Sequence, residues 1–139
     1  MPMSNLTAED LSNIPLIDAA DIQWRVRDLI GRAITRKIWL LLLDAERRQL
    51  PVFLPIDGLP THAPPGESMG PFLRAVCQEP TREVVCVLER PGGYGLTPAD
   101  RGWLQLFASG VTEAGLGLAG MVLSQTHGTR WLPAEEWGS

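Results

Sequence analysis

The sequence predicts a mixed α/β (α+β) domain in which a mixed central β-sheet is flanked by helices. Two continuous apolar runs carry this prediction, because a strand that is covered on both faces shows no polar alternation. They are KIWLLLLD (37–44) and EVVCVLE (83–89). A third apolar stretch, LGLAGMVLSQ (116–125), follows a long helical pattern and returns as a strand. The 139 residues, 45% of them hydrophobic, are enough for one domain with its own core.

The chain begins with a polar stretch that contains two prolines, and we expect residues 1–16 to be a flexible N-terminal arm. The single domain then covers residues 17–139. Asp18 is a suitable N-cap for a helix over residues 19–34. The apolar residues of this helix fall on one face at helical spacing: Ile22, Val26, Leu29, Ile30 and Ala33.

A β-hairpin is predicted next, because the polar turn DAERRQ separates the run at 37–44 from LPVFLPI at 50–56. Pro51 and Pro55 place the second strand at a sheet edge, since proline cannot donate to a strand ladder. A loop rich in Pro and Gly follows. Ser68 is a candidate cap for a short helix that contains Met69, Phe72, Leu73 and Val76.

The longest helical pattern starts after a glycine-rich loop. Thr97 is a candidate N-cap, Pro98 occupies the first helical position, and Gly115 is a suitable stop. Asp100 lies in the first turn, where the helix dipole and free N–H groups stabilise a carboxylate by about 0.3–1 kcal/mol. The predicted buried stripe consists of Trp103, Leu104, Phe107, Val111 and Ala114.

This helix joins the strands at 83–89 and 116–125, an arrangement that suits a right-handed crossover between parallel neighbours. A turn at residues 126–130 then leads to a short edge strand at 131–132.

The charge balance disfavours a nucleic-acid surface. The formal net charge is −4, and phosphate binding requires clustered Lys and Arg. The densest basic group is interpreted as a solvated helix face: Arg25, Arg27, Arg32, Arg36 and Lys37.

The two cysteines, Cys77 and Cys86, stand in apolar contexts and are expected to be buried small hydrophobic residues. No CxxC or Cys/His cluster suggests a structural zinc ion. The apolar run at 38–43 is too short to cross a bilayer, and the N-terminus lacks the features of a signal peptide. We therefore expect no membrane association and a cytoplasmic protein.

Three stretches share their order of elements and several local phrases with a known family. They are LLLLDAERRQLPVFLPIDGL, FLRAVCQEPTREVVCVLERPGG and TPADRGWLQLFASGVTEAGLGLAGMVLSQ, within about residues 37–130. On these stretches the chain resembles the JAB/MPN domain and, within it, the RadC-like branch. The resemblance implies the JAB/MPN (cytidine-deaminase-like) architecture.

Active members of that family are zinc hydrolases of peptide or isopeptide bonds. Their motif reads His-x-His-Pro, then a short loop, then Ser-x-x-Asp. The two His and the Asp hold zinc and leave a position for water, whose pKa the metal lowers. An upstream Glu acts on that water, and its position falls near Val52 in this sequence.

The metal ligands of the motif are mostly replaced here. Pro91 matches the motif proline, so the two His positions fall on Leu88 and Arg90, while Thr97 and Asp100 match Ser and Asp. Leu88 has no donor atom, and the fixed cation of Arg90 does not bind metals. The resemblance therefore implies a degenerate site with no metal, no cofactor and no catalytic residue.

Two functions from different classes remain open. The first is a non-catalytic protein-binding or assembly module. The alternative is a hydrolase or small-molecule-binding enzyme with altered chemistry in the former zinc pocket. The residues of this degenerate pocket are Leu88, Glu89, Arg90, Pro91, Tyr94, Thr97 and Asp100.

Five tryptophans are many for one small core, and tryptophan is enriched at interface hot spots. Trp131 and Trp137, in RWLPAEEW near the C-terminus, are the candidates for a surface that binds a protein partner. The alternative is that both fold back onto their own domain. A homodimer is plausible, because homodimers are the commonest oligomers.

Overall fold

The computed structural model describes residues 15–64 and 66–138, so most of the predicted arm at residues 1–16 lies outside the described residues. Its last residue, Leu16, is buried. The Leu16 N–H donates to the Arg47 carbonyl at 2.8 Å, and Arg47 Nε donates to the Leu16 carbonyl at 2.6 Å. The chain is therefore anchored to the domain from Leu16 onward.

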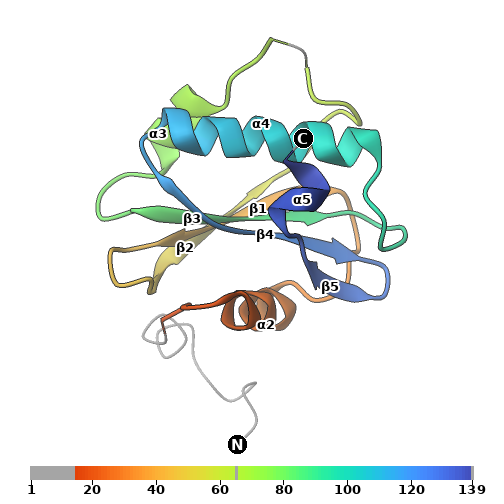
Figure 1. Ribbon diagram of the computed structural model, residues 1–139, viewed down its shortest axis with the longest axis horizontal. Coiled ribbons are helices and arrows are strands. Elements are labelled where there is room, and N and C mark those ends of the chain that lie inside the picture. The colour runs from red at the N-terminus through yellow and green to blue at the C-terminus, as the bar shows by residue number, and fades with distance from the viewer. Residues whose placement is uncertain (1–14, 65, 139) are drawn as a thin grey trace, which may run out of the picture.

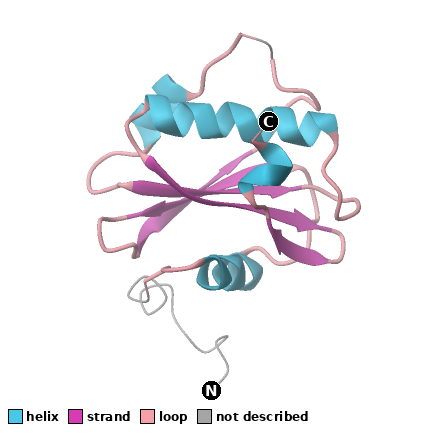
Figure 2. Cartoon of the chain, viewed as in Figure 1, coloured by secondary structure: helices cyan, strands magenta, loops and turns pink. Residues whose placement is uncertain are grey.

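A five-stranded mixed sheet with the strand order β2-β1-β3-β4-β5 forms the centre of the protein (Figures 1 and 2), which confirms the α/β (α+β) prediction. The β1–β2 hairpin is antiparallel, and β2 lies at the edge. β1 pairs antiparallel with β3, β3 pairs parallel with β4, and β4 pairs antiparallel with β5. The strands are β1 (Lys37–Leu43), β2 (Gln49–Ile56), β3 (Glu83–Glu89), β4 (Gly117–Gln125) and β5 (Gly128–Trp131).

Helices cover both faces of the sheet, as Figure 1 shows. α2 (Ala19–Leu29) packs against β4 and β5 on one face. α4 (Pro98–Glu113) crosses the other face, with α3 (Gly70–Val76) and α5 (Ala134–Trp137) beside it. The sheet therefore has a separate apolar cluster on each face. The cluster under α4 includes Leu40, Leu73, Leu88, Leu104 and Phe107. The cluster under α2 includes Ile22, Val26, Val85, Val87 and Val122.

α2 begins at the predicted residue but ends at Leu29, not at residue 34. Asp18 caps it as expected, and its Oδ1 accepts the Asp21 N–H at 2.9 Å. Gly31 adopts a left-handed backbone with φ 71° and stops the helix. The prediction was wrong here because Ala33 continues the helical spacing beyond that glycine.

The structure also corrects two local predictions. Ser68 does not cap α3, since Met69 is the N-cap and makes no side-chain cap bond. The Ser68 hydroxyl contacts the Glu113 carboxylate and accepts the Gly70 N–H. The last strand is β5, which ends at Trp131 and does not span residues 131–132.

Both cysteines are free and buried, which confirms that they serve as small hydrophobic residues. Burial raises the pKa of Cys77 to about 11 and that of Cys86 to about 12. Across residues 15–64 and 66–138, no helix has the length and apolar character needed to cross a bilayer.

Candidate functional site

An internal ion pair occupies the site that the sequence predicts around Pro91. Arg90 follows the last residue of β3, and its Nε and Nη2 donate to Asp100 Oδ2 at 3.2 Å and 3.0 Å. Its Nη1 and Nη2 also donate to the carbonyls of Gly93 and Gly95 at 2.7 Å and 2.8 Å. The two side chains are 7% and 2% exposed. The guanidinium therefore holds both the helix carboxylate and the glycine-rich loop.

Asp100 receives further donors from the start of α4. The Thr97 N–H donates to Asp100 Oδ2 at 3.0 Å, and the Asp100 N–H donates to Thr97 Oγ1 at 3.0 Å. This reciprocal pair is a capping box and confirms Thr97 as the N-cap. Asp100 therefore lies in the first turn and accepts a free N–H group, as predicted, and in addition it is buried and paired with Arg90.

These residues do not fit a metal ion. Leu88 is buried in the apolar cluster under α4, where it offers no donor atom. Arg90 holds Asp100 through the oxygen atom that also accepts the Thr97 N–H. Among the residues that the structure describes, no group of three or more His, Cys, Asp or Glu could hold a metal. Val52, near the position of the family's upstream Glu, lies within β2.

Glu89 does not belong to this pocket, contrary to the prediction. Its neighbours in β3 that share its orientation, Val85 and Val87, lie in the cluster under α2, on the opposite face from Leu88. The Glu89 carboxylate accepts hydrogen bonds from the Ile34 N–H at 2.8 Å, the Thr35 N–H at 3.2 Å and the Trp39 indole at 2.8 Å. These hydrogen bonds hold the residues that follow α2 against the sheet.

The protonation of Glu89 follows from the same contacts. Burial raises its pKa, but the hydrogen bonds to its carboxylate and the nearby Lys37 charge outweigh burial, so the pKa lies below its usual value. Glu89 is therefore ionised at neutral pH and is not suited to act as a general acid.

The Tyr94 side chain is not a hydrogen-bond partner of Arg90 or Asp100. It is 53% exposed, and its ring stacks on His127 with centroids 6.2 Å apart. Pro91 is exposed as well. The structure thus brings Arg90, Thr97 and Asp100 together, whereas Glu89, Pro91 and Tyr94 contribute nothing to that cluster.

The tryptophans of the C-terminal stretch are both partly buried against their own domain. Trp131 packs on the cluster under α2, and Trp137 packs on the cluster under α4. The Trp137 indole donates to the Leu132 carbonyl at 3.2 Å. Arg130 pairs with Glu136, which secures α5. Their part in an interface stays a prediction.

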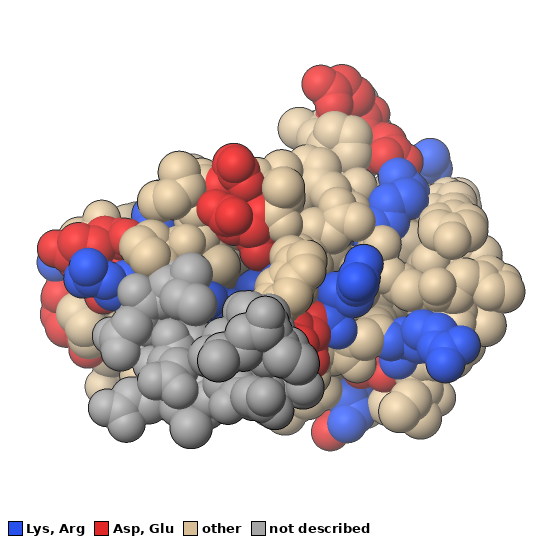
Figure 3. All heavy atoms as spheres, turned by 90° about the horizontal axis from the view of Figure 1, so that it is seen from below, with Lys and Arg blue, Asp and Glu red and all other residues tan. Residues whose placement is uncertain are grey.

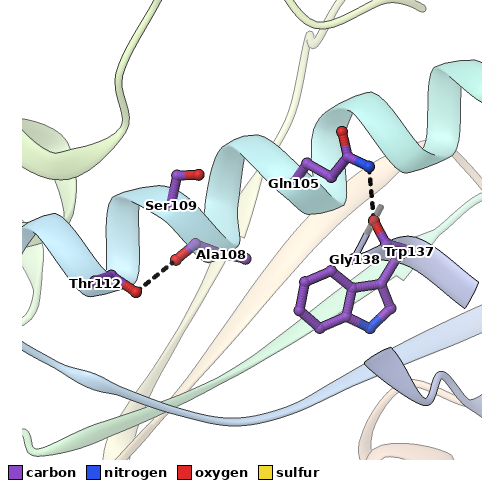
Figure 4. Close-up of a pocket in the computed structure, with 6 residues that line it drawn as sticks. All are labelled: Gln105, Ala108, Ser109, Thr112, Trp137 and Gly138. Atoms are coloured by element: carbon purple, nitrogen blue, oxygen red, sulfur yellow. Dashed lines mark hydrogen bonds between the residues drawn. The ribbon is translucent and has the colours of Figure 1, made fainter. Parts of the chain in front are cut away.

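A groove runs between the outer side of α4 and the end of α5 (Figure 4). Its volume is about 410 Å³, and it is lined by uncharged groups and the Trp137 ring. Gln105 Nε2 donates to the Trp137 carbonyl at 2.7 Å across one end of the groove. The groove contains no titratable side chain, so it suits binding better than acid–base chemistry.

Sequence reasoning missed a second surface, on α2. Trp24 is 39% exposed and lines a hollow of about 160 Å³ together with Ala20, Gln23 and Arg27. The sequence pattern could have indicated this surface. Ile22 and Val26 form the inward stripe of the helix, and Trp24 lies two positions from each of them, so it points away from that stripe.

The prediction that the basic residues around α2 form one solvated helix face was wrong, because Arg32, Arg36 and Lys37 follow the end of the helix. Arg25 is buried, and its Nη1 donates to Gln49 Oε1 at 2.6 Å. On the face that carries α2, Figure 3 shows basic and acidic side chains interspersed among uncharged ones.

A scan of the sequence against models of known protein families gives no match, and a search of curated proteins also gives none.

Proposed function

We propose that this protein is a catalytically inactive JAB/MPN-like domain that serves as a protein-binding or assembly module. The observation that carries the proposal is the buried pair of Arg90 and Asp100. At the positions where the resemblance expects metal ligands, Leu88 belongs to the core and Arg90 is a permanent cation. A guanidinium that holds Asp100 and two loop carbonyls supports the loop without a metal ion.

The binding surface that we propose is the α2 surface, formed by Ala20, Gln23, Trp24 and Arg27. Tryptophan and arginine dominate interface hot spots, because each offers a large contact area with a polar group. The partner that fits this surface is a protein that sets an apolar side chain against Trp24 and a carboxylate against Arg27. The groove at Trp137 is the second surface available to a partner.

Self-association and affinity capture test this function with three single variants. Trp24→Ser and Arg27→Glu alter the proposed surface. Phe72→Ser is the matched control, because Phe72 is an aromatic residue of the same 39% exposure on α3. We expect the wild type and Phe72→Ser to capture a protein partner, or to form a dimer detected by light scattering. Trp24→Ser and Arg27→Glu should lose that partner or that dimer.

Two outcomes contradict the proposal. One is a wild-type protein that is monomeric and captures no protein at all. The other is hydrolysis of peptide or isopeptide substrates that survives Trp24→Ser but disappears with Asp100→Asn in a folded variant.

A small-molecule-binding role near Arg90 is the second candidate, and one observation favours it. Gln125, the buried last residue of β4, has no hydrogen-bond partner for its Nε2 among the described residues. Leu123 has the same orientation and lies in the cluster under α4, so Gln125 faces the side of Arg90. A ligand there would accept from this amide, and Gln125→Met would abolish its binding.

A further inference from the structure

The α2 surface leaves apolar side chains in contact with water. Trp24 is 39% exposed, and Ile17, which directly precedes the cap of the helix, is 62% exposed. Ala20 and Trp24 are four positions apart and share one helix face, where they line the hollow of about 160 Å³ together with Gln23 and Arg27. Arg27 takes part in none of the ion pairs between described residues. The surface therefore offers an apolar contact beside a cation that has no counterion among the described residues.

The chain outside the described residues starts at the same end of α2. Leu16 is buried and shares two hydrogen bonds with Arg47, so the backbone is fixed two residues before the N-cap Asp18. Residues 1–14 lie outside the described residues, and fully extended they span about 45 Å. The 11 residues of α2 are only about 16 Å long. Residues 1–14 are therefore long enough to run along the whole helix.

Residues 1–14 also contain the two kinds of group that the α2 surface lacks. Glu9 and Asp10 are acidic, and this segment contains no Lys or Arg. Leu11 follows Asp10 directly, so a carboxylate and an apolar side chain are adjacent in the chain. On α2, Trp24 and Arg27 are three positions apart and therefore neighbours on the helix surface. The two pairs are complementary in charge and alike in apolar character.

The spacing along the chain agrees with this match. Leu11 is five residues before Leu16, which corresponds to about 16 Å of extended chain. Trp24 follows Leu16 by two extended and six helical residues, which is also at most about 16 Å. The same count gives about 20 Å for both Asp10 and Arg27. A chain that turns back at Leu16 thus brings Leu11 to Trp24 and Asp10 to Arg27.

We propose that residues 9–11 dock on the α2 surface of their own chain, with Leu11 in the hollow beside Trp24 and Asp10 paired with Arg27. Because the segment is tethered, its effective concentration at the surface is of millimolar order, so a small contact area is sufficient. Docking covers the side chains that a protein partner would contact. This regulatory consequence rests on the proposed function, whereas the docking itself does not.

Nuclear magnetic resonance of the full chain tests the docking through the indole N–H signal of Trp24, which Trp24→Phe assigns. A soluble paramagnetic agent broadens this signal when the ring is accessible. Leu11→Ser should shift the signal and increase its broadening. Met3→Ser is the matched control and should leave the signal unchanged, because this apolar residue lies beyond the end of α2 when Leu11 is at Trp24.

The ion pair has its own test. Asp10→Arg and Arg27→Glu should each increase the broadening, because each brings like charges together. The double variant restores opposite charges and should return the signal toward that of the wild type. The proposal is overturned if Leu11→Ser and Met3→Ser leave the signal unchanged or change it equally. It is also overturned if the double variant behaves as the sum of the two single variants.

Partner capture separates this inference from the proposed function. If docking covers the surface, Leu11→Ser should capture more of a protein partner than the wild type does, while Trp24→Ser captures none. A Trp24 signal that responds to Leu11→Ser in a protein that captures no partner supports the docking and contradicts the proposed function. Capture that requires Trp24, in a protein whose Trp24 signal does not respond to Leu11→Ser, contradicts the docking alone.

Discussion

Arg90 places a permanent positive charge beneath a loop that contains three glycines. Glycine loops lose much conformational entropy on folding, so they need strong internal contacts. The guanidinium supplies these contacts to Gly93 and Gly95 and fixes the start of α4 through Asp100. Its planar array of donors suits this task better than the point charge of a lysine.

Removing the charge of Arg90 should be costly. Arg90→Met keeps most of the volume but leaves the Asp100 carboxylate buried without its counterion, and breaking such a pair costs about 3–5 kcal/mol. Urea unfolding measures this change. Arg90→Met combined with Asp100→Asn should be more stable than Arg90→Met alone, because the uncompensated charge is gone.

The control for this prediction is Arg82→Met. Arg82 also pairs with a carboxylate, that of Glu79, at 2.8 Å, but both side chains are exposed. Exposed pairs contribute about 0–1 kcal/mol. If Arg82→Met and Arg90→Met lower the free energy of unfolding equally, the buried pair stabilises the protein no more than the exposed pair does.

At the scale of single elements, α4 depends on its first turn. Thr97→Ala removes the oxygen that accepts the Asp100 N–H and should lower the free energy of unfolding by about 0.5–2 kcal/mol. Thr97→Ser keeps that oxygen and should remain close to the wild type. Chemical denaturation of both variants tests the cap, and an equal loss in both would assign the effect to the lost methyl group.

The same turn shows what the sequence could predict and what it could not. Thr97, Pro98 and Gly115 act through local chemistry, so the bounds of α4 were predictable from residue types. The ion pair joins Arg90 to a residue ten positions away, and sequence spacing contains no information on that contact. Asp100 was therefore expected to contribute through the helix dipole and the free N–H groups of the first turn, and its pairing with Arg90 was missed.

The strands were also predictable from residue types, but the face of the sheet to which each side chain points was not. Between its two terminal glutamates EVVCVLE is apolar, which marks a central strand but gives no alternation that distinguishes its faces. Grouping Leu88, Glu89 and Arg90 in one pocket overlooked that successive side chains of a strand point to opposite faces. Glu89 consequently serves the α2 face, and Arg90 serves the α4 face.

At the scale of the whole molecule, the C-terminal stretch acts as part of the domain. Truncation after Arg130 would remove Leu132, which is fully buried, together with the partly buried Trp131 and Trp137. Each large apolar side chain contributes about 1.5–3 kcal/mol when fully buried, so the melting temperature should fall clearly. Calorimetry and light scattering on the same samples measure stability and mass.

We expect the truncated protein to keep the oligomeric state of the full chain, so its apparent mass should fall only by the mass of the removed residues. Trp137→Ser is the milder companion variant, since it leaves Leu132 in place. A drop to half the mass at an unchanged melting temperature would show instead that Trp131 or Trp137 holds two subunits together.

β2 closes one side of the sheet to further strands. Pro55 pairs with Trp39 in the hairpin, and its nitrogen has no hydrogen to offer an incoming chain. Backbone groups alternate in direction along a strand, so the Phe53 N–H points to the same side as the Pro55 nitrogen, and Pro51 lies beside the shift in register. A foreign strand would meet an interrupted row of donors, which discourages strand exchange and fibril growth at this edge. The prolines of β2 therefore disfavour recognition by strand addition at this edge of the sheet.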